Sequence, residues 1–93
     1  MWHSFRDICL RIETSLEWEM VFKKLAGHLH NLPYNPDLYK MLNNIDDMVQ
    51  ELSKAEVEAR RLHKPEYTKQ KVDAINDAID HFEKLLIIAK LVA

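Results

Sequence analysis

The chain has 93 residues, of which 47% are hydrophobic and 30% are charged, and this balance excludes an intrinsically disordered chain. One domain is expected at this length, and a single glycine with three prolines favours long helices over a turn-rich sheet protein. The formal net charge of −2, with acids and bases interspersed, predicts neither a nucleic-acid nor an acidic-membrane partner.

The first residues bear on the cellular compartment. Cys9 is the only cysteine, which excludes an intrachain disulfide, and its neighbours Ile8 and Ile12 favour a buried apolar side chain over a reactive thiol. The opening stretch MWHSFRDICLRIETS carries charges throughout and lacks the apolar run of a signal peptide. No segment reaches the roughly 20 apolar residues that span a bilayer. We therefore expect a cytoplasmic protein.

Residues 2–31 are predicted to be helical, although their apolar residues lie on two faces. One face carries Trp2, Phe5, Ile8, Cys9, Ile12, Leu16 and Met20. The other, rotated by roughly 140°, carries Trp18, Val21, Phe22, Leu25, Leu29 and Leu32. A break near residues 13–15 would explain the change of face, since Thr14 and Glu17 have the spacing of a capping box. We favour an unbroken or kinked helix, because the first 26 residues contain neither Gly nor Pro.

Residues 36–63 show the clearest pattern, a heptad repeat. Apolar residues recur every seven positions in two interleaved sets, Leu38, Ile45, Leu52 and Ala59, and Met41, Met48, Ala55 and Leu62. Such a repeat predicts a helix that packs along a second helix. Asn35 is expected to cap this helix, Pro36 suits its first position, and the charge of Asp37 complements its dipole.

Residues 66–92 repeat the pattern and complete the predicted fold. Their apolar sets are Val72, Ile79, Leu86 and Ala93, and Ile75, Phe82 and Ala89. Pro65 removes a backbone donor between the two helices, and the short connection predicts an antiparallel hairpin. We therefore predict an all-α fold in which the N-terminal helix, kinked or split, packs on this hairpin as a three- to four-helix bundle. One domain would span residues 1–93.

The end of the last helix carries surplus apolar residues. Ile87, Ile88 and Leu91 fall at heptad positions that hold polar side chains one repeat earlier. Leaving three such side chains in water forgoes about 1.5–3 kcal/mol each, so we expect something to cover them. The cover is either the chain's own turn at residues 32–36 or a second polypeptide, which is another copy or a different protein.

These surplus apolar faces predict a protein–protein interaction module that forms a homodimer or larger homo-oligomer, or that binds another protein. The candidate interface residues are Trp2, Phe5, Ile12, Leu16, Met20, Ile87, Ile88 and Leu91. By fold-level analogy, immunity proteins, inhibitors and chaperone-like accessory proteins also have this size and helical content.

Side chains arranged for chemistry are sparse in this sequence. It shows no nucleophile–base pair, zinc-ligand spacing or glycine-rich phosphate loop, so we expect neither an enzyme nor a metal or cofactor. The alternative function is nucleic-acid binding at the hairpin tip. The basic patch in question comprises Arg60, Arg61, Lys64, Lys69 and Lys71. Neighbouring glutamates dilute its charge, and basic residues also stabilise the end of a helix, which favours a structural role.

Overall fold

The structure, a computed structural model, describes residues 11–92. Its elements are the 3-10 turn η1 (Ser15–Glu17), helix α2 (Trp18–His30), helix α3 (Pro36–Leu62), the 3-10 turn η2 (Pro65–Thr68) and helix α4 (Lys69–Val92). None of the described residues forms a strand. The predicted all-α class is therefore confirmed.

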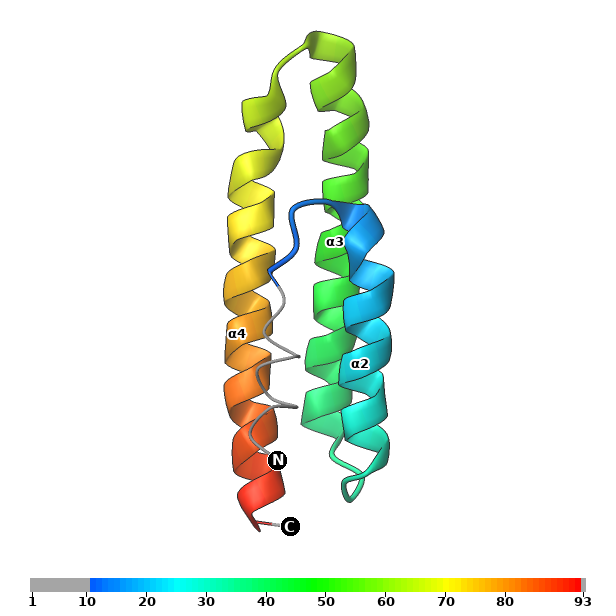
Figure 1. Ribbon diagram of the computed structural model, residues 1–93, viewed down its shortest axis with the longest axis vertical. Helices are drawn as coiled ribbons and strands as arrows, with labels where there is room; N and C mark the ends of the chain where they lie inside the picture. The colour runs from blue at the N-terminus through cyan, green and yellow to red at the C-terminus, as the bar shows by residue number, and fades with distance from the viewer. Residues whose placement is uncertain (1–10, 93) are drawn as a thin grey trace.

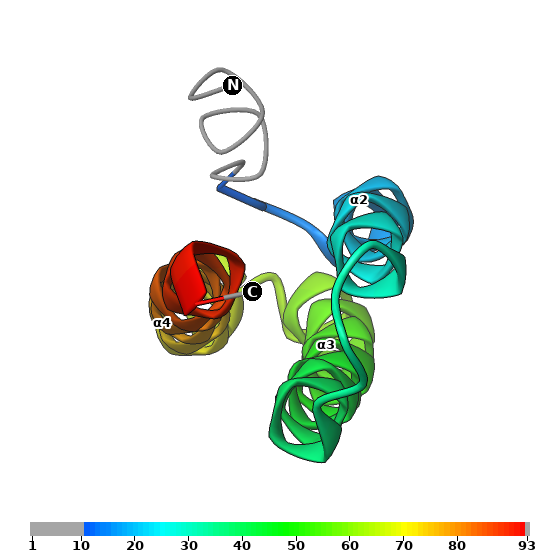
Figure 2. The same ribbon diagram turned by 90° about the horizontal axis from the view of Figure 1, so that it is seen from below.

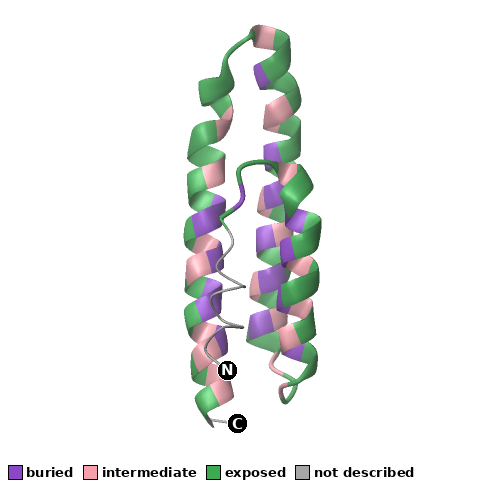
Figure 3. Ribbon diagram, in the orientation of Figure 1, coloured by how far each residue is buried: buried purple, intermediate pink, exposed green. Residues whose placement is uncertain are grey.

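Helices α3 and α4 run antiparallel and lie side by side, as Figure 1 shows. The first predicted heptad set of α3 is buried, and its Ile45 and Leu52 share a core with Ile79 and Phe82 of α4. The second set of α3, Met41, Met48, Ala55 and Leu62, is only partly buried. Figure 3 shows the buried positions along the sides where the two helices face each other. The heptad pattern thus identifies the core because each repeat returns an apolar side chain to the same seam.

Both ends of α3 follow from local sequence. At the start, the Asn35 side-chain oxygen accepts a hydrogen bond from the Asp37 N–H at 3.1 Å, and Pro36 occupies the first helical position. At the end, His63 adopts a left-handed conformation with φ 55°. The Lys64 N–H then donates to the Ala59 carbonyl at 2.9 Å, which closes the helix before η2.

Helix α2 packs on α3 through the second apolar stripe of the N-terminal third. Its buried residues are Trp18, Val21, Leu25 and Leu29. The Trp18 indole N–H donates to an Asp46 carboxylate oxygen of α3 at 2.8 Å. With 13 residues against 27, α2 is about 20 Å long beside an α3 of about 40 Å. Figure 1 shows that α2 follows α3 only along the half that is distant from the hairpin tip, and Figure 2 shows α2 beside α3 when seen along the long axis.

A segment here called the strap (residues 11–17) crosses from α4 to the start of α2 (Figure 1); residues 11–14 are not helical, and residues 15–17 are η1. The buried Asn76 side chain of α4 holds its first part, because it accepts from the Ile12 N–H and donates to the Ile12 carbonyl, each at 2.9 Å. Glu56 of α3 holds its second part, since its carboxylate accepts from the Ser15 N–H at 3.0 Å and from the Ser15 hydroxyl.

The strap corrects the prediction of an unbroken helix over residues 2–31. Residues 11–14 are not helical, so the break near residues 13–15 is the alternative that the structure contains. The helix gives way because Asn76 and Glu56 satisfy backbone groups that helical hydrogen bonds would otherwise satisfy. The Glu17 side chain also accepts a hydrogen bond from this part of the strap, from the Glu13 N–H at 3.1 Å. The predicted capping box between Thr14 and Glu17 is not formed, because the Thr14 side chain makes no cap hydrogen bond.

Candidate functional site

The end of α4 lies beside the turn that connects α2 and α3. The residues that line the space between them are Leu32, Pro33, Tyr34, Asn35, Pro36, Asp37, Leu38, Leu85, Ile88 and Ala89. They enclose a cavity of about 550 Å³ with a mostly apolar wall. The predicted intramolecular cover is therefore present but leaves a groove open.

Apolar side chains stand exposed around this groove. Tyr34 is 78% exposed, Leu91 is 74% exposed and Ile88 is 56% exposed, whereas Ile87 is only partly exposed. The Tyr34 ring packs against Tyr39, with ring centroids 5.5 Å apart. We call the groove together with Tyr34, Ile88 and Leu91 the C-terminal surface. Tyr34 belongs to the turn at residues 32–36 that is predicted to cover the end of α4, but the structure leaves most of this residue in solvent.

Two basic side chains from different helices, His28 and Lys90, interact at this end of the molecule. Partial burial of His28 in α2 lowers its pKa below the usual 6.5, and the positive charge of Lys90 in α4 lowers it further. The imidazole is therefore held toward its neutral form near neutral pH.

The N-terminal candidate residues separate into distinct environments. Leu16 is 90% exposed at the strap end, and Met20 is exposed one turn later in α2. Ile12 is only 1% exposed, so its prediction as an interface residue is wrong, because Asn76 anchors its backbone within the core. Trp2 and Phe5 lie outside the described residues.

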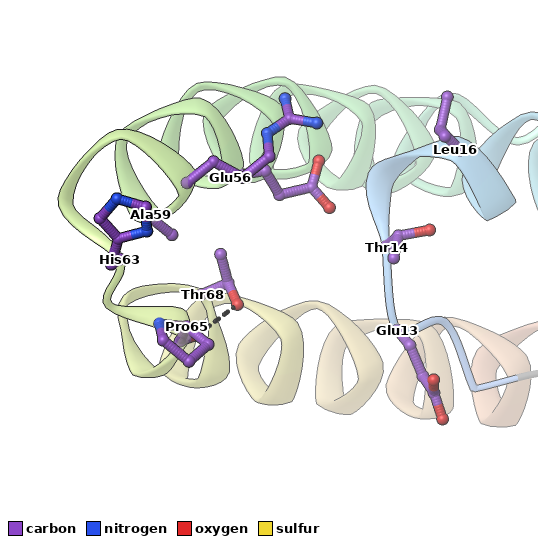
Figure 4. Close-up of a pocket in the computed structure, with 9 residues that line it drawn as sticks. Glu13, Thr14, Leu16, Glu56, Ala59, His63, Pro65 and Thr68 are labelled. Carbon is purple, nitrogen blue, oxygen red and sulfur yellow. Dashed lines mark hydrogen bonds between the residues drawn. The ribbon is translucent and has the colours of Figure 1, made fainter.

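A second groove, here called the tip groove, lies between α3, η2 and the strap (Figure 4). Its volume is about 790 Å³, and its lining residues are Glu13, Thr14, Leu16, Glu56, Ala59, Arg60, His63, Pro65 and Thr68. Sequence reasoning missed this groove. The signal was available in the heptad repeat, where Ala55 and Ala59 replace the larger residues that precede them.

The basic patch at the hairpin tip is exposed at all five predicted positions. Arg61, however, donates to the Glu58 carboxylate, with a distance of 2.7 Å from its terminal nitrogen, and this contact lowers the pKa of Glu58 and raises that of Arg61. The Lys64 ammonium lies 5.9 Å from the centre of the Tyr67 ring. These partners reduce the positive field that a nucleic-acid backbone would meet.

Within the described part of the chain, no three His, Cys, Asp or Glu side chains gather in a way that could hold a metal ion. The helices of that part are also too short or too polar for any of them to cross a membrane. Comparison of the chain with protein-family models, with curated proteins and with solved structures found no match.

Proposed function

We propose that this protein is a protein-binding module and that the C-terminal surface is its binding site. The observation that carries the proposal is the exposure of Ile88, which lines an apolar groove, and of Leu91, which follows it three residues later in α4. Single exposed apolar residues are ordinary on a protein surface, but a cluster around a groove is typical of an interaction site.

The shape of this surface favours a macromolecular partner over a small molecule. Leu91 and Tyr34 project from it, so a partner must bury protruding side chains as well as enter the groove. Tyrosine is also enriched at protein interfaces, where its ring supplies a large contact area and its hydroxyl tolerates water. Burying Ile88 and Leu91 contributes about 1.5–3 kcal/mol each, enough for either to be a central anchor.

The test compares the wild type with Ile88→Asp and with Val57→Asp, which changes an exposed valine of α3 that lines neither groove. Each purified protein is immobilised, proteins captured from the native host are identified, and light scattering reports self-association. Partners retained by the wild type and by Val57→Asp should be lost with Ile88→Asp, while helical circular dichroism is unchanged. If Ile88→Asp unfolds the protein, or captures the same partners, the C-terminal surface is not the binding site.

A further inference from the structure

The tip groove exists because nothing in the described chain completes the hairpin there. Helix α2 begins at Trp18, level with the strap, so the tip half of α3 and α4 has no third helix over it (Figure 1). Between Leu52 and Ile75, Ala59 is the only buried residue. Its small side chain forms part of the groove wall between α3 and η2 (Figure 4).

An apolar projection stands directly on the rim of this hollow. Leu16 of η1 lines the groove and is nevertheless 90% exposed, and Met20, four residues later in α2, is exposed as well. A surface that carries a projection next to a matching hollow is complementary to itself. A two-fold axis lets each copy place its projection in the hollow of the other, as isologous interfaces require.

The charged side chains that line the groove are also complementary between two copies, because acidic and basic residues lie at opposite ends of it. Glu13 lies at the strap end of the groove, whereas His63 lies at its tip end (Figure 4). Arg60 also lines the groove and belongs to the last turn of α3. In the part of the chain that the structure describes, neither Glu13 nor Arg60 takes part in an ion pair. Glu56, between the two ends, already accepts two hydrogen bonds from Ser15. A two-fold axis reverses the groove and brings the Glu13 end of one copy to the Arg60 end of the other.

We propose that two copies of this chain form a two-fold symmetric dimer at the tip groove, in which Leu16 of each copy packs over Ala59 of the other. Glu13 and Arg60 form ion pairs at the rim across the interface. This dimer uses a different surface from the one in the proposed function, because the tip groove and the C-terminal surface share no residue.

The first test measures the dimer dissociation constant by sedimentation equilibrium for the wild type, Leu16→Glu and Val57→Glu. Leu16→Glu should weaken the dimer by at least about a hundredfold, because two leucines are withdrawn from each interface. Its helical circular dichroism should not change, since Leu16 makes few contacts within one copy. Val57→Glu should match the wild type. A wild type that remains monomeric at every concentration, or a Leu16→Glu dimer of unchanged strength, overturns the proposal.

The second test exchanges the charges at the two ends of the groove. Glu13→Arg and Arg60→Glu each place like charges together at both symmetric sites and should weaken the dimer about tenfold. The double variant with both changes restores opposite charges across the two-fold axis and should recover most of the wild-type affinity. Failure of the double variant to bind more tightly than both single variants excludes this pairing.

The variant Ile88→Asp separates this dimer from the proposed function. A dimer at the tip groove predicts that Ile88→Asp keeps the wild-type dissociation constant. If Ile88→Asp abolishes self-association while Leu16→Glu retains it, the tip dimer is excluded and the C-terminal surface remains as the binding site. If Leu16→Glu is monomeric but still captures partners that Ile88→Asp loses, both proposals stand.

Discussion

Asn76 is a polar residue of α4 that is buried, with only 3% of its surface exposed. Burial of an amide is tolerated when each of its groups has a hydrogen-bond partner. Here the amide oxygen and nitrogen pair with the N–H and carbonyl of Ile12, as two neighbouring β-strands would pair. One side chain therefore fixes where the strap leaves α4.

Replacing Asn76 tests how strongly the strap is held. Asn76→Ala should lower the free energy of unfolding by about 2–4 kcal/mol, because it leaves the buried N–H and carbonyl of Ile12 without partners. Urea denaturation followed by circular dichroism measures the change. Asn43→Ala, at an exposed position of α3, is the matched control and should shift stability by less than about 0.5 kcal/mol. An equally small effect of Asn76→Ala would mean that water replaces the amide without cost.

The lowered pKa of His28 predicts that the stability of the folded protein depends on pH. Its pKa is lowered in the folded state by burial and by Lys90, so the unfolded state binds more protons as the pH falls below 6.5. The free energy of unfolding should therefore be unaffected by this group above its unfolded pKa and should decrease on acidification. Urea titrations at about pH 7.5 and about pH 5.5 measure that difference.

The variant His28→Gln provides the comparison for this prediction. It should lose a smaller part of its stability between the two pH values than the wild type does. Lys90→Gln removes the weaker cause of the lowered pKa and should lie between the two. Equal losses for all three proteins would show that His28 does not contribute to the pH dependence in this range.

At the level of elements, α3 and α4 could be predicted from the sequence because their information is local and repeated. The heptad spacing of Leu38, Ile45 and Leu52 sets the buried seam, and Pro65 sets the end of the hairpin arm. The cap by Asn35 was equally readable, since the residues that form it lie two positions apart. Patterns of this kind need no knowledge of the rest of the fold.

The strap could not be predicted in the same way, because the residues that hold it are distant in sequence. Asn76 lies 64 positions from Ile12, and Glu56 lies 41 positions from Ser15. A partial signal exists in α4, where the buried polar residues Asn76 and Glu83 stand one heptad apart beside the core seam. A buried polar side chain in that register needs a hydrogen-bond partner, and Asn76 finds its partners in the backbone of Ile12.

The alanines of α3 give a prediction about the tip half of the hairpin. Ala59→Leu should fill part of the tip groove and raise the free energy of unfolding by about 0.5–2 kcal/mol, because it buries apolar surface in an existing hollow. Thermal unfolding measured at a concentration where the protein is monomeric would report the change. A loss of stability would show that Ala59 is already closely packed.

At the level of the whole molecule, periodicity identifies apolar faces but does not determine which of them remain exposed. Ile12 and Leu16 share one predicted stripe, yet the strap buries the first and leaves the second in solvent. Ile87 and Ile88 are adjacent in sequence, yet Ile87 is partly buried and Ile88 is exposed. The turn between α2 and α3 does not cover Ile88, which lines the groove beside that turn. Exposure depends on how segments meet, which the sequence pattern alone does not encode.

The shape of the molecule makes the proposed dimer measurable in solution. One copy measures 48 × 25 × 17 Å. The tip groove is lined by the strap, the last turns of α3 and η2, and Figure 1 shows that these segments lie toward one end of the long axis. A two-fold axis through that groove directs the remaining length of the two copies in opposite directions. Because the overlap covers only the last two to three turns of α3, the dimer should have a maximum dimension of roughly 80 Å.

Small-angle X-ray scattering of the wild type at increasing concentration measures this length. The maximum dimension should rise from about that of one copy toward roughly 80 Å, and it should not rise for Leu16→Glu. Copies that associated side by side along α2 and α3 would stay below about 60 Å, since helix packing adds only 8–10 Å across the width for each layer. A compact dimer would therefore contradict association at the tip, whatever its affinity.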